Sequence, residues 1–280
     1  MLGVWLFLLI VYGSTWALNL SLRTAAAAGS SGAVYTFLFG TVWAPTAAAL
    51  ILTLILGGRA SCGQLLRRLW RAPADARWFV AAAVVPFAVV WLGVLSARAL
   101  GDLAPRPGVS LWPSIIGMQM ISGAVGEELG WRGFLLTNLS RRVGFTMAAM
   151  LSALLWSAWH IAGAFFPGLG PQLAPLIPFL TFVGVFGVFL AFVFARTGQV
   201  LAPMLAHLSL NVTLAVAGIP LASRPFWWIL VFATAAVVMA AYFTAWPANI
   251  ALEPAADRPS IKYTLPPNAG RCPCRVVSGR

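Results

Sequence analysis

Charged side chains are scarce in this sequence. Only 9% of its 280 residues are charged and six are acidic, whereas hydrophobic residues make up 61%. A soluble domain carries about 25% charged residues, so most side chains of this chain do not face water. In place of charge, continuous apolar runs of about 20 residues recur, and each is long enough to cross a bilayer as a helix. The runs do not alternate in polarity, which argues against a β-barrel.

The apolar runs predict an all-α fold, a polytopic transmembrane helical bundle of about eight spans. Each run is continuous over the length that a membrane helix needs, about 20 residues. The expected spans are 2–22, 33–56, 78–97, 114–137, 146–165, 176–195, 200–218 and 226–245.

Basic residues are distributed unevenly between these spans. The net charge of +12 would suggest a nucleic-acid partner in a soluble protein, but here the arginines lie in short loops, as the positive-inside rule expects. Thirteen of the eighteen basic residues fall on the side of both termini and four on the other, while Arg132 lies within a span. We therefore expect both termini and the loop 57–77 to be cytoplasmic. The excess of Arg and Ala hints at a GC-rich bacterial genome, so we expect the protein to lie in a bacterial plasma membrane.

Six polar side chains stand where a bilayer makes them costly. Ionisable residues within spans normally face a bundle interior or a wet cavity, and both histidines of the sequence are among them. The six are Glu127, Glu128 and Arg132 in the fourth span, His160 in the fifth, and His207 and Asn211 in the seventh.

Helical spacing sorts these side chains into groups. Glu128 and Arg132 are four residues apart, as are His207 and Asn211, so each pair shares a helix face. Glu127 is turned about 100° from Glu128, so one carboxylate can pair with Arg132 while the other faces a cavity. Counted at ~1.5 Å per residue from the cytoplasmic helix ends, the cavity candidates lie about 10–21 Å deep. These depths predict one cavity that opens to the cytoplasm.

At these residues the sequence resembles the CPBP family, which includes type II CAAX prenyl endopeptidases and bacteriocin-processing, Abi-like proteins. The family pattern is Glu-Glu-x-x-x-Arg, then an aromatic residue four positions before a His, then His-x-x-x-Asn or Asp, each in a separate span. This chain reads EELGWR, WSAWH and HLSLN in that order. It departs from the family at Trp156, where Phe is usual, and we expect this ring to line the pocket and pack rather than react.

The predicted spans, together with the resemblance over about residues 110–220, divide the chain into four segments. We expect N-terminal transmembrane helices over 1–109, a CPBP-like catalytic core over 110–220 and a last transmembrane helix over 221–245. Residues 246–280 are rich in Pro and Arg and lack an apolar period, which is typical of a flexible tail. By the predicted topology this tail is cytoplasmic.

The resemblance implies an intramembrane endopeptidase that acts on a membrane-associated substrate. The chemistry needs a positioned base, donors aimed at the developing oxyanion, and a cavity that supplies water, which is scarce in the bilayer. The implied roles are water activation by Glu127 and His160, a structural ion pair of Glu128 with Arg132, and oxyanion stabilisation by His207 and Asn211.

A metal ion is an open alternative. Glu127, His160 and His207 make up a His₂Glu set of the catalytic zinc type, and they are the expected ligands if a divalent metal such as zinc is present. The helical HExxH spacing that marks many such sites is absent, and the family chemistry can also be written without a metal. The sequence therefore fixes no cofactor.

Two other classes of function remain alternatives. One is a non-catalytic membrane scaffold or immunity protein that keeps the fold. The other is a proton-coupled transporter, because Glu and His within spans also mark ion paths; the lack of repeat symmetry between the halves argues against it. The expected partners are the lipid bilayer and a peptide or lipidated protein substrate, and no nucleic acid.

Overall fold

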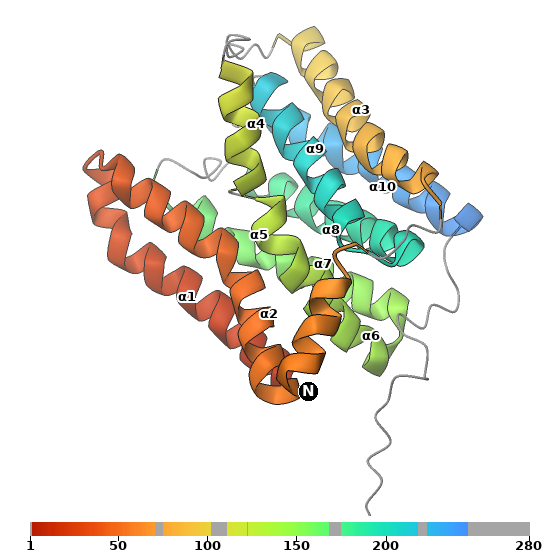
Figure 1. Ribbon diagram of the computed structural model, residues 1–280. Coiled ribbons are helices and arrows are strands. Elements are labelled where there is room, and N and C mark those ends of the chain that lie inside the picture. The colour runs from red at the N-terminus through yellow and green to blue at the C-terminus, as the bar shows by residue number, and fades with distance from the viewer. Residues whose placement is uncertain are drawn as a thin grey trace, which may run out of the picture.

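The computed structural model describes residues 2–70, 75–101, 111–121, 123–167, 175–217 and 223–245. Within these segments the chain is helical and contains no strand, which confirms the predicted all-α bundle (Figure 1). The predicted tail 246–280 lies outside the described residues. The helical elements are α1 (Leu2–Ala27), α2 (Ser31–Arg67), α3 (Arg77–Ala99), α4 (Trp112–Ile121), α5 (Ala124–Glu128), a π-helical segment (Leu129–Leu136), α6 (Thr137–Val143), α7 (Phe145–Ala164), α8 (Leu176–Thr197), α9 (Leu201–Ala217) and α10 (Arg224–Ala245).

Among the described helices, six are long and apolar enough to cross a membrane, namely α1, α2, α3, α7, α8 and α10. They coincide with six of the predicted spans. The predicted seventh span is α9, which is apolar but only 17 residues long. α2 continues to Arg67 through much of the predicted loop 57–77, with a bend at Gly58. The structure thus confirms a polytopic bundle but not the count of eight spans.

The predicted fourth span, 114–137, is not one continuous helix. α4 ends at Ile121, and α5 begins after Gly123, whose φ of −156° and ψ of −111° are not helical. The π-helical segment follows directly on α5. Apolar periodicity cannot reveal such a break, because the pieces on both sides of it are equally apolar. The prediction of a single uninterrupted span was wrong for this reason.

Two glycines bring the segment after the break close to α2. A Cβ atom added to Gly126 would lie 2.8 Å from the carbonyl oxygen of Val42, and one added to Gly130 would lie 2.5 Å from that of Pro45. No side chain fits at either distance. Small residues four positions apart therefore let the two backbones meet, as in other membrane helix pairs, and this contact places the neighbouring carboxylates inside the bundle.

The helices form two groups with the polar segment between them. α1 packs along α2 on one side, whereas α3, α9 and α10 gather on the other (Figure 1). α5 lies between the groups and contacts both α2 and α9, and the π-helical segment contacts α2 and α7. The polar residues of this segment are thus surrounded by helices rather than by lipid.

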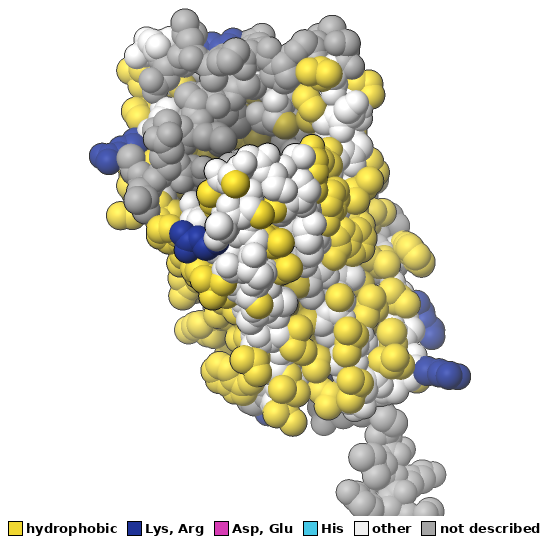
Figure 2. Space-filling view, turned by 90° about the vertical axis from the view of Figure 1, so that its left-hand side faces the viewer, with side chains coloured by type: hydrophobic (Ala, Val, Ile, Leu, Met, Phe, Trp, Pro, Cys, Tyr) yellow, Lys and Arg dark blue, Asp and Glu magenta, His cyan; other side chains and the backbone are white. Residues whose placement is uncertain are grey.

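The outside of the bundle is apolar. Leu9, Ile55 and Phe232 are 69%, 72% and 69% exposed, and many other large hydrophobic side chains are exposed with them. Figure 2 shows hydrophobic side chains spread over one face, with isolated Arg or Lys side chains at its margins. Apolar surface of this extent is not stable in water, so it fits contact with lipid.

Candidate functional site

The segment after the helix break carries three buried charged groups. Glu127 and Glu128 end α5, and Arg132 follows in the π-helical segment; their exposed fractions are 4%, 0% and 1%. Arg132 Nη1 donates to Glu128 Oε1 over 2.9 Å. The sequence spacing predicted this contact, and the structure has it. Each charge would be costly if buried alone, and pairing offsets part of that cost.

His207 joins this ion pair from the neighbouring helix α9. Its Nδ1 lies 2.8 Å from Glu128 Oε1, the same oxygen that accepts from Arg132. A carboxylate can only accept, so Nδ1 carries a proton, and Nε2 is the only ring nitrogen that could hold a lone pair. Helical spacing could not predict this contact, because the two residues are 79 positions apart. Glu128 therefore ties α9 to the segment that carries Glu127.

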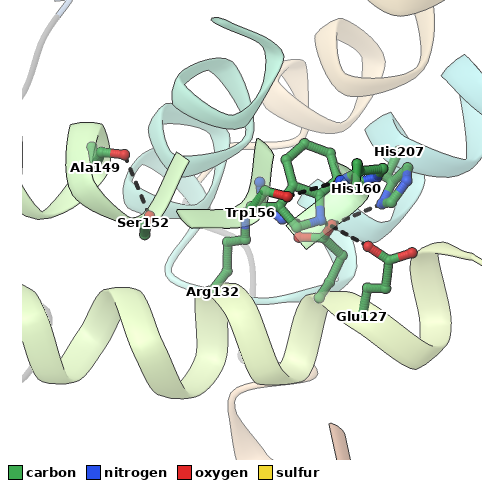
Figure 3. A network of polar contacts seen from close by, with 8 residues as sticks. Glu127, Arg132, Ala149, Ser152, Trp156, His160 and His207 are labelled. Carbon is green, nitrogen blue, oxygen red and sulfur yellow. Dashed lines mark hydrogen bonds and ion pairs between the residues drawn. The ribbon is translucent and has the colours of Figure 1, made fainter. Parts of the chain in front are cut away.

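Trp156 of α7 lies at the centre of the site. Its indole Nε1 donates to Glu127 Oε2 over 2.8 Å, and the guanidinium carbon of Arg132 stands 4.4 Å from the ring centroid. His160 and His207 meet the same ring edge-on, at 5.0 and 5.3 Å between centroids. Figure 3 shows these side chains converging from separate helices. The sequence led us to expect packing by this ring rather than reaction, and the structure adds a hydrogen bond from its N–H to a carboxylate.

His160 is fixed by the backbone of its own helix. Its Nδ1 lies 2.8 Å from the carbonyl oxygen of Trp156, one turn earlier. A carbonyl accepts and does not donate, so Nδ1 is the protonated nitrogen of the neutral ring. Nε2 then holds the lone pair. Trp156 thus contacts both candidate water-activating residues, Glu127 through its side chain and His160 through its main chain.

Glu127 and His160 line one cavity of about 200 Å³. A volume of this size accommodates several waters. Trp159 is also part of the wall, and its Nε1 donates to Thr15 Oγ1 of α1 over 2.8 Å. The other described lining residues are Phe37, Leu38, Thr41, Val42 and Gly163. The cavity therefore brings together the two residues for which the sequence predicted water activation.

This cavity lies toward the end of the bundle that holds the α1–α2 turn. Its lining includes Gly163, next to the last residue of α7, and Phe37, six residues into α2. By the predicted topology, this end faces away from the cytoplasm. The prediction of a cytoplasmic opening used only the depth of each residue below the cytoplasmic surface. It left out the distance from the opposite surface. His160 is ~21 Å from the start of α7 but only four residues from its end. The residues that line the cavity therefore lie nearer the end of the bundle opposite to the predicted cytoplasmic opening.

The predicted oxyanion pair is divided between two surroundings. Neither His207 nor Asn211 is among the described residues that line the 200 Å³ cavity. His207 is held by Glu128, whereas Asn211 lies beside the helix break, where a Cβ added to Gly123 would come within 2.8 Å of its Nδ2. Their role in binding an oxyanion therefore stays a prediction.

The predicted metal ligands do not converge. Within the described part of the chain, no three His, Cys, Asp or Glu side chains are grouped closely enough to hold a metal ion. Both histidines use Nδ1 for a hydrogen bond to oxygen, His160 to a carbonyl and His207 to Glu128, so Nε2 is the atom of each ring that could bind a metal ion. As the side chains lie, however, the three residues do not form a His₂Glu zinc site.

Comparison with known families agrees with the motifs. Residues 108–213 match the family described as type II CAAX prenyl endopeptidase Rce1-like. The matched segment contains all the residues of the three sequence motifs, from Glu127 to Asn211, which confirms the predicted resemblance to membrane CAAX proteases. A search of curated proteins finds no match to the chain. The match and the six apolar helices together support an integral membrane protein of a protease-like type.

Proposed function

We propose that this protein is an intramembrane endopeptidase that hydrolyses a peptide bond with water activated by Glu127 and His160. The observation that carries the proposal is their shared fixation by Trp156, at 2.8 Å in each case, on the wall of one cavity. A base and its partner are useful only when both are held within reach of the same water. In this proposal Trp156 alone holds both residues, Glu127 through its indole N–H and His160 through its carbonyl oxygen.

The chemistry follows from the atoms that the two residues present. Water in the cavity gives a proton to the Glu127 carboxylate, or to His160 Nε2, as its oxygen bonds to the scissile carbonyl carbon. The carbon–nitrogen bond then breaks, and the proton taken from water passes to the leaving nitrogen. A positioned group of this kind contributes typically 10²–10⁴-fold to the rate. The products are one carboxylic acid and one amine, so the step needs no other reactant.

Glu128, Arg132 and His207 support this chemistry structurally in the proposal. Glu128 and Arg132 cancel each other's charge, and the bond to His207 holds α9 against α5. His207 can donate from Nε2 to an oxyanion only when its ring carries a second proton, because Nδ1 already faces Glu128. The substrate class is a peptide anchored in the membrane or carrying a lipid, in keeping with the description of the matched family.

The test is cleavage of fluorogenic peptides, one prenylated and one anchored by a transmembrane segment, by purified protein. Glu127→Gln should keep the fold, since Gln is nearly isosteric and less costly to bury, and should lose at least ~10²-fold in turnover. His160→Ala should lose a similar factor. The double variant should be little worse than either single one, because residues that act as a unit are not additive.

Circular dichroism of each variant provides the control for folding. Near-normal turnover by a folded Glu127→Gln protein would remove the general base from the proposal. If the wild-type protein cleaves neither peptide, the proposal fails and the non-catalytic and transporter alternatives are favoured.

A further inference from the structure

The cavity that Glu127 and His160 line has a second wall, to which the proposed chemistry gives no role. α2 supplies this wall through Phe37, Leu38, Thr41 and Val42. The four residues form two pairs with a spacing of four, so they share one side of the helix. α2 lies outside residues 108–213, the segment that matches the protease family. The family match therefore assigns no function to this wall.

The α2 wall is held directly against the segment that carries Glu127. A Cβ atom added to Gly126 would lie 2.8 Å from the carbonyl oxygen of Val42, so the two backbones are in contact there. Gly126 immediately precedes Glu127, and Val42 is itself part of the wall. A group that binds to this face of α2 is therefore presented beside Glu127, and a bond-breaking step needs such proximity.

The α2 wall offers an apolar surface. Thr41 is buried, and its hydroxyl donates to the carbonyl oxygen of Phe37 over 2.8 Å, so its proton is already used within the helix. The other three side chains of the wall are hydrocarbon. A carboxylate or amide oxygen would find no free donor among these four side chains and would lose its hydrogen bonds to water. The wall therefore suits an apolar side chain.

Leu38 is the side chain of this wall that is least involved in core packing. Phe37 stacks on Phe166 with 3.9 Å between ring centroids and 5° between ring planes, and both are 2% exposed. Leu38 is half-buried, and it belongs to neither hydrophobic cluster in the part of the chain that the structure describes. Its size can therefore change without removing a core contact of the bundle.

The cavity has room for one apolar side chain. Its volume is about 200 Å³, and an apolar cavity of about 150 Å³ holds a molecule of benzene. Water attacks the scissile carbonyl carbon, and the side chain of the same residue begins two bonds from that carbon. Among the substrate side chains, this one therefore lies closest to the α2 wall when the carbonyl is beside Glu127.

We propose that Leu38 determines specificity, because the α2 wall binds the apolar side chain of the residue that supplies the scissile carbonyl. This inference rests on the proposed peptidase function and names the part of the substrate that the cavity selects. Leu38 limits the size of the accepted side chain. The wild-type protein should therefore cleave after Leu faster than after Trp.

The experiment uses three membrane-anchored fluorogenic peptides that differ only in that residue, which is Ala, Leu or Trp. The ratio of kcat/KM between peptides is measured for each variant in detergent. Leu38→Ala should raise the Trp-to-Leu ratio at least about 10-fold, the lower end of what a small change in an apolar pocket contributes. Leu38→Trp should shift the preference toward Ala. The two variants predict opposite shifts, so either one that folds tests the inference.

Leu50→Ala is the matched control. Leu50 is also half-buried on α2, but it packs on the main hydrophobic cluster and is not among the described residues that line the cavity. Its truncation should lower the melting temperature and leave both ratios unchanged. A change of the ratios in Leu50→Ala equal to that in Leu38→Ala would assign the effect to a general loosening of α2 and overturn the specificity role.

A binding measurement separates this inference from the peptidase proposal. The melting temperature of Glu127→Gln protein, with and without Leu38→Ala, is recorded with each peptide, because a bound ligand raises it. Cleavage with ratios that do not respond to either Leu38 variant would overturn the specificity role and leave the peptidase proposal standing. If the wild type cleaves none of the peptides, stabilisation by the Trp peptide that appears only with Leu38→Ala would support the subsite alone. Without cleavage and without such stabilisation, both proposals fail.

Discussion

Replacing Trp156 by Phe is the sharpest perturbation that the site offers. It removes the indole N–H that lies 2.8 Å from Glu127 Oε2 and keeps an aromatic ring in the same place. The carbonyl of residue 156 still accepts from His160. The change therefore separates the positioning of Glu127 from that of His160.

The magnitude follows from the nature of the lost bond. A hydrogen bond to a charged group contributes ~1.5–3 kcal/mol, and a buried acceptor left without its donor costs a similar amount. If this bond orients Glu127 for proton transfer, turnover should fall about 10- to 150-fold, since each 1.36 kcal/mol is a factor of ten. Substrate affinity should change less, because the indole N–H faces the carboxylate rather than the cavity contents.

Trp159→Phe is the matched control. Trp159 lies three residues away on α7, is 6% exposed, and donates its Nε1–H to Thr15 Oγ1 over the same 2.8 Å. Both variants lose similar ring volume and one hydrogen bond. The Trp159 bond joins neutral partners and contributes only ~0.5–1.5 kcal/mol, so this variant should lose some thermal stability and keep most of its turnover.

The assay is turnover and KM for the fluorogenic membrane peptide, with melting temperatures for both variants. Equal loss of turnover in the two variants would mean that cavity shape, not the bond to Glu127, sets the rate. Wild-type turnover in Trp156→Phe would show that Glu127 needs no help from the indole. Either result would refute the positioning role.

The remaining predictions concern charge and topology. Arg132→Ala should destabilise the fold by ~3–5 kcal/mol, because it leaves Glu128 buried without its cation; a stable but inactive variant would instead move Arg132 into the chemistry. Glu128→Gln should likewise lower the melting temperature in detergent. A strong chelator should leave cleavage unchanged, and inhibition reversed by added zinc would restore the metal alternative. A reporter fused after residue 244 should show a cytoplasmic location. A single cysteine placed at Gln64, with the native cysteines replaced by serine, should also be cytoplasmic; its labelling in intact cells by an impermeant reagent would contradict the predicted topology.

Much of the bundle was predictable because lipid imposes a simple pattern. A helix such as α8, whose 22 residues carry one charged side chain, in the last turn, gives an unambiguous signal in a window of membrane length. The break at Gly123 gave none, since the segments on both sides of it are apolar. Gly126 and Gly130 meet the backbone of α2, and a contact between distant segments leaves no trace in local periodicity. The bend at Gly58 was not predicted either. It depends on the backbone φ angle of that one residue, which apolar periodicity does not report.

The site was predictable only along single helices. The pair of Glu128 and Arg132 follows from a spacing of four, which one helix fixes. The bonds that join helices, from Trp156 to Glu127 and from His207 to Glu128, depend on packing between residues 29 and 79 positions apart. An indole also packs and donates, and the sequence alone does not say which property the fold uses.

The two adjacent carboxylates differ most in what holds them. Glu128 receives hydrogen bonds on one oxygen from a guanidinium and an imidazole, and the guanidinium charge makes the ionised carboxyl indispensable to the helix contacts there. Glu127 is held by the indole of Trp156, a neutral donor. A neutral donor fixes the position of a carboxylate oxygen without requiring a permanent charge on the group. In the proposed mechanism, Glu127 can therefore take up and return a proton while the ion pair beside it stays intact, as a general base inside a membrane requires.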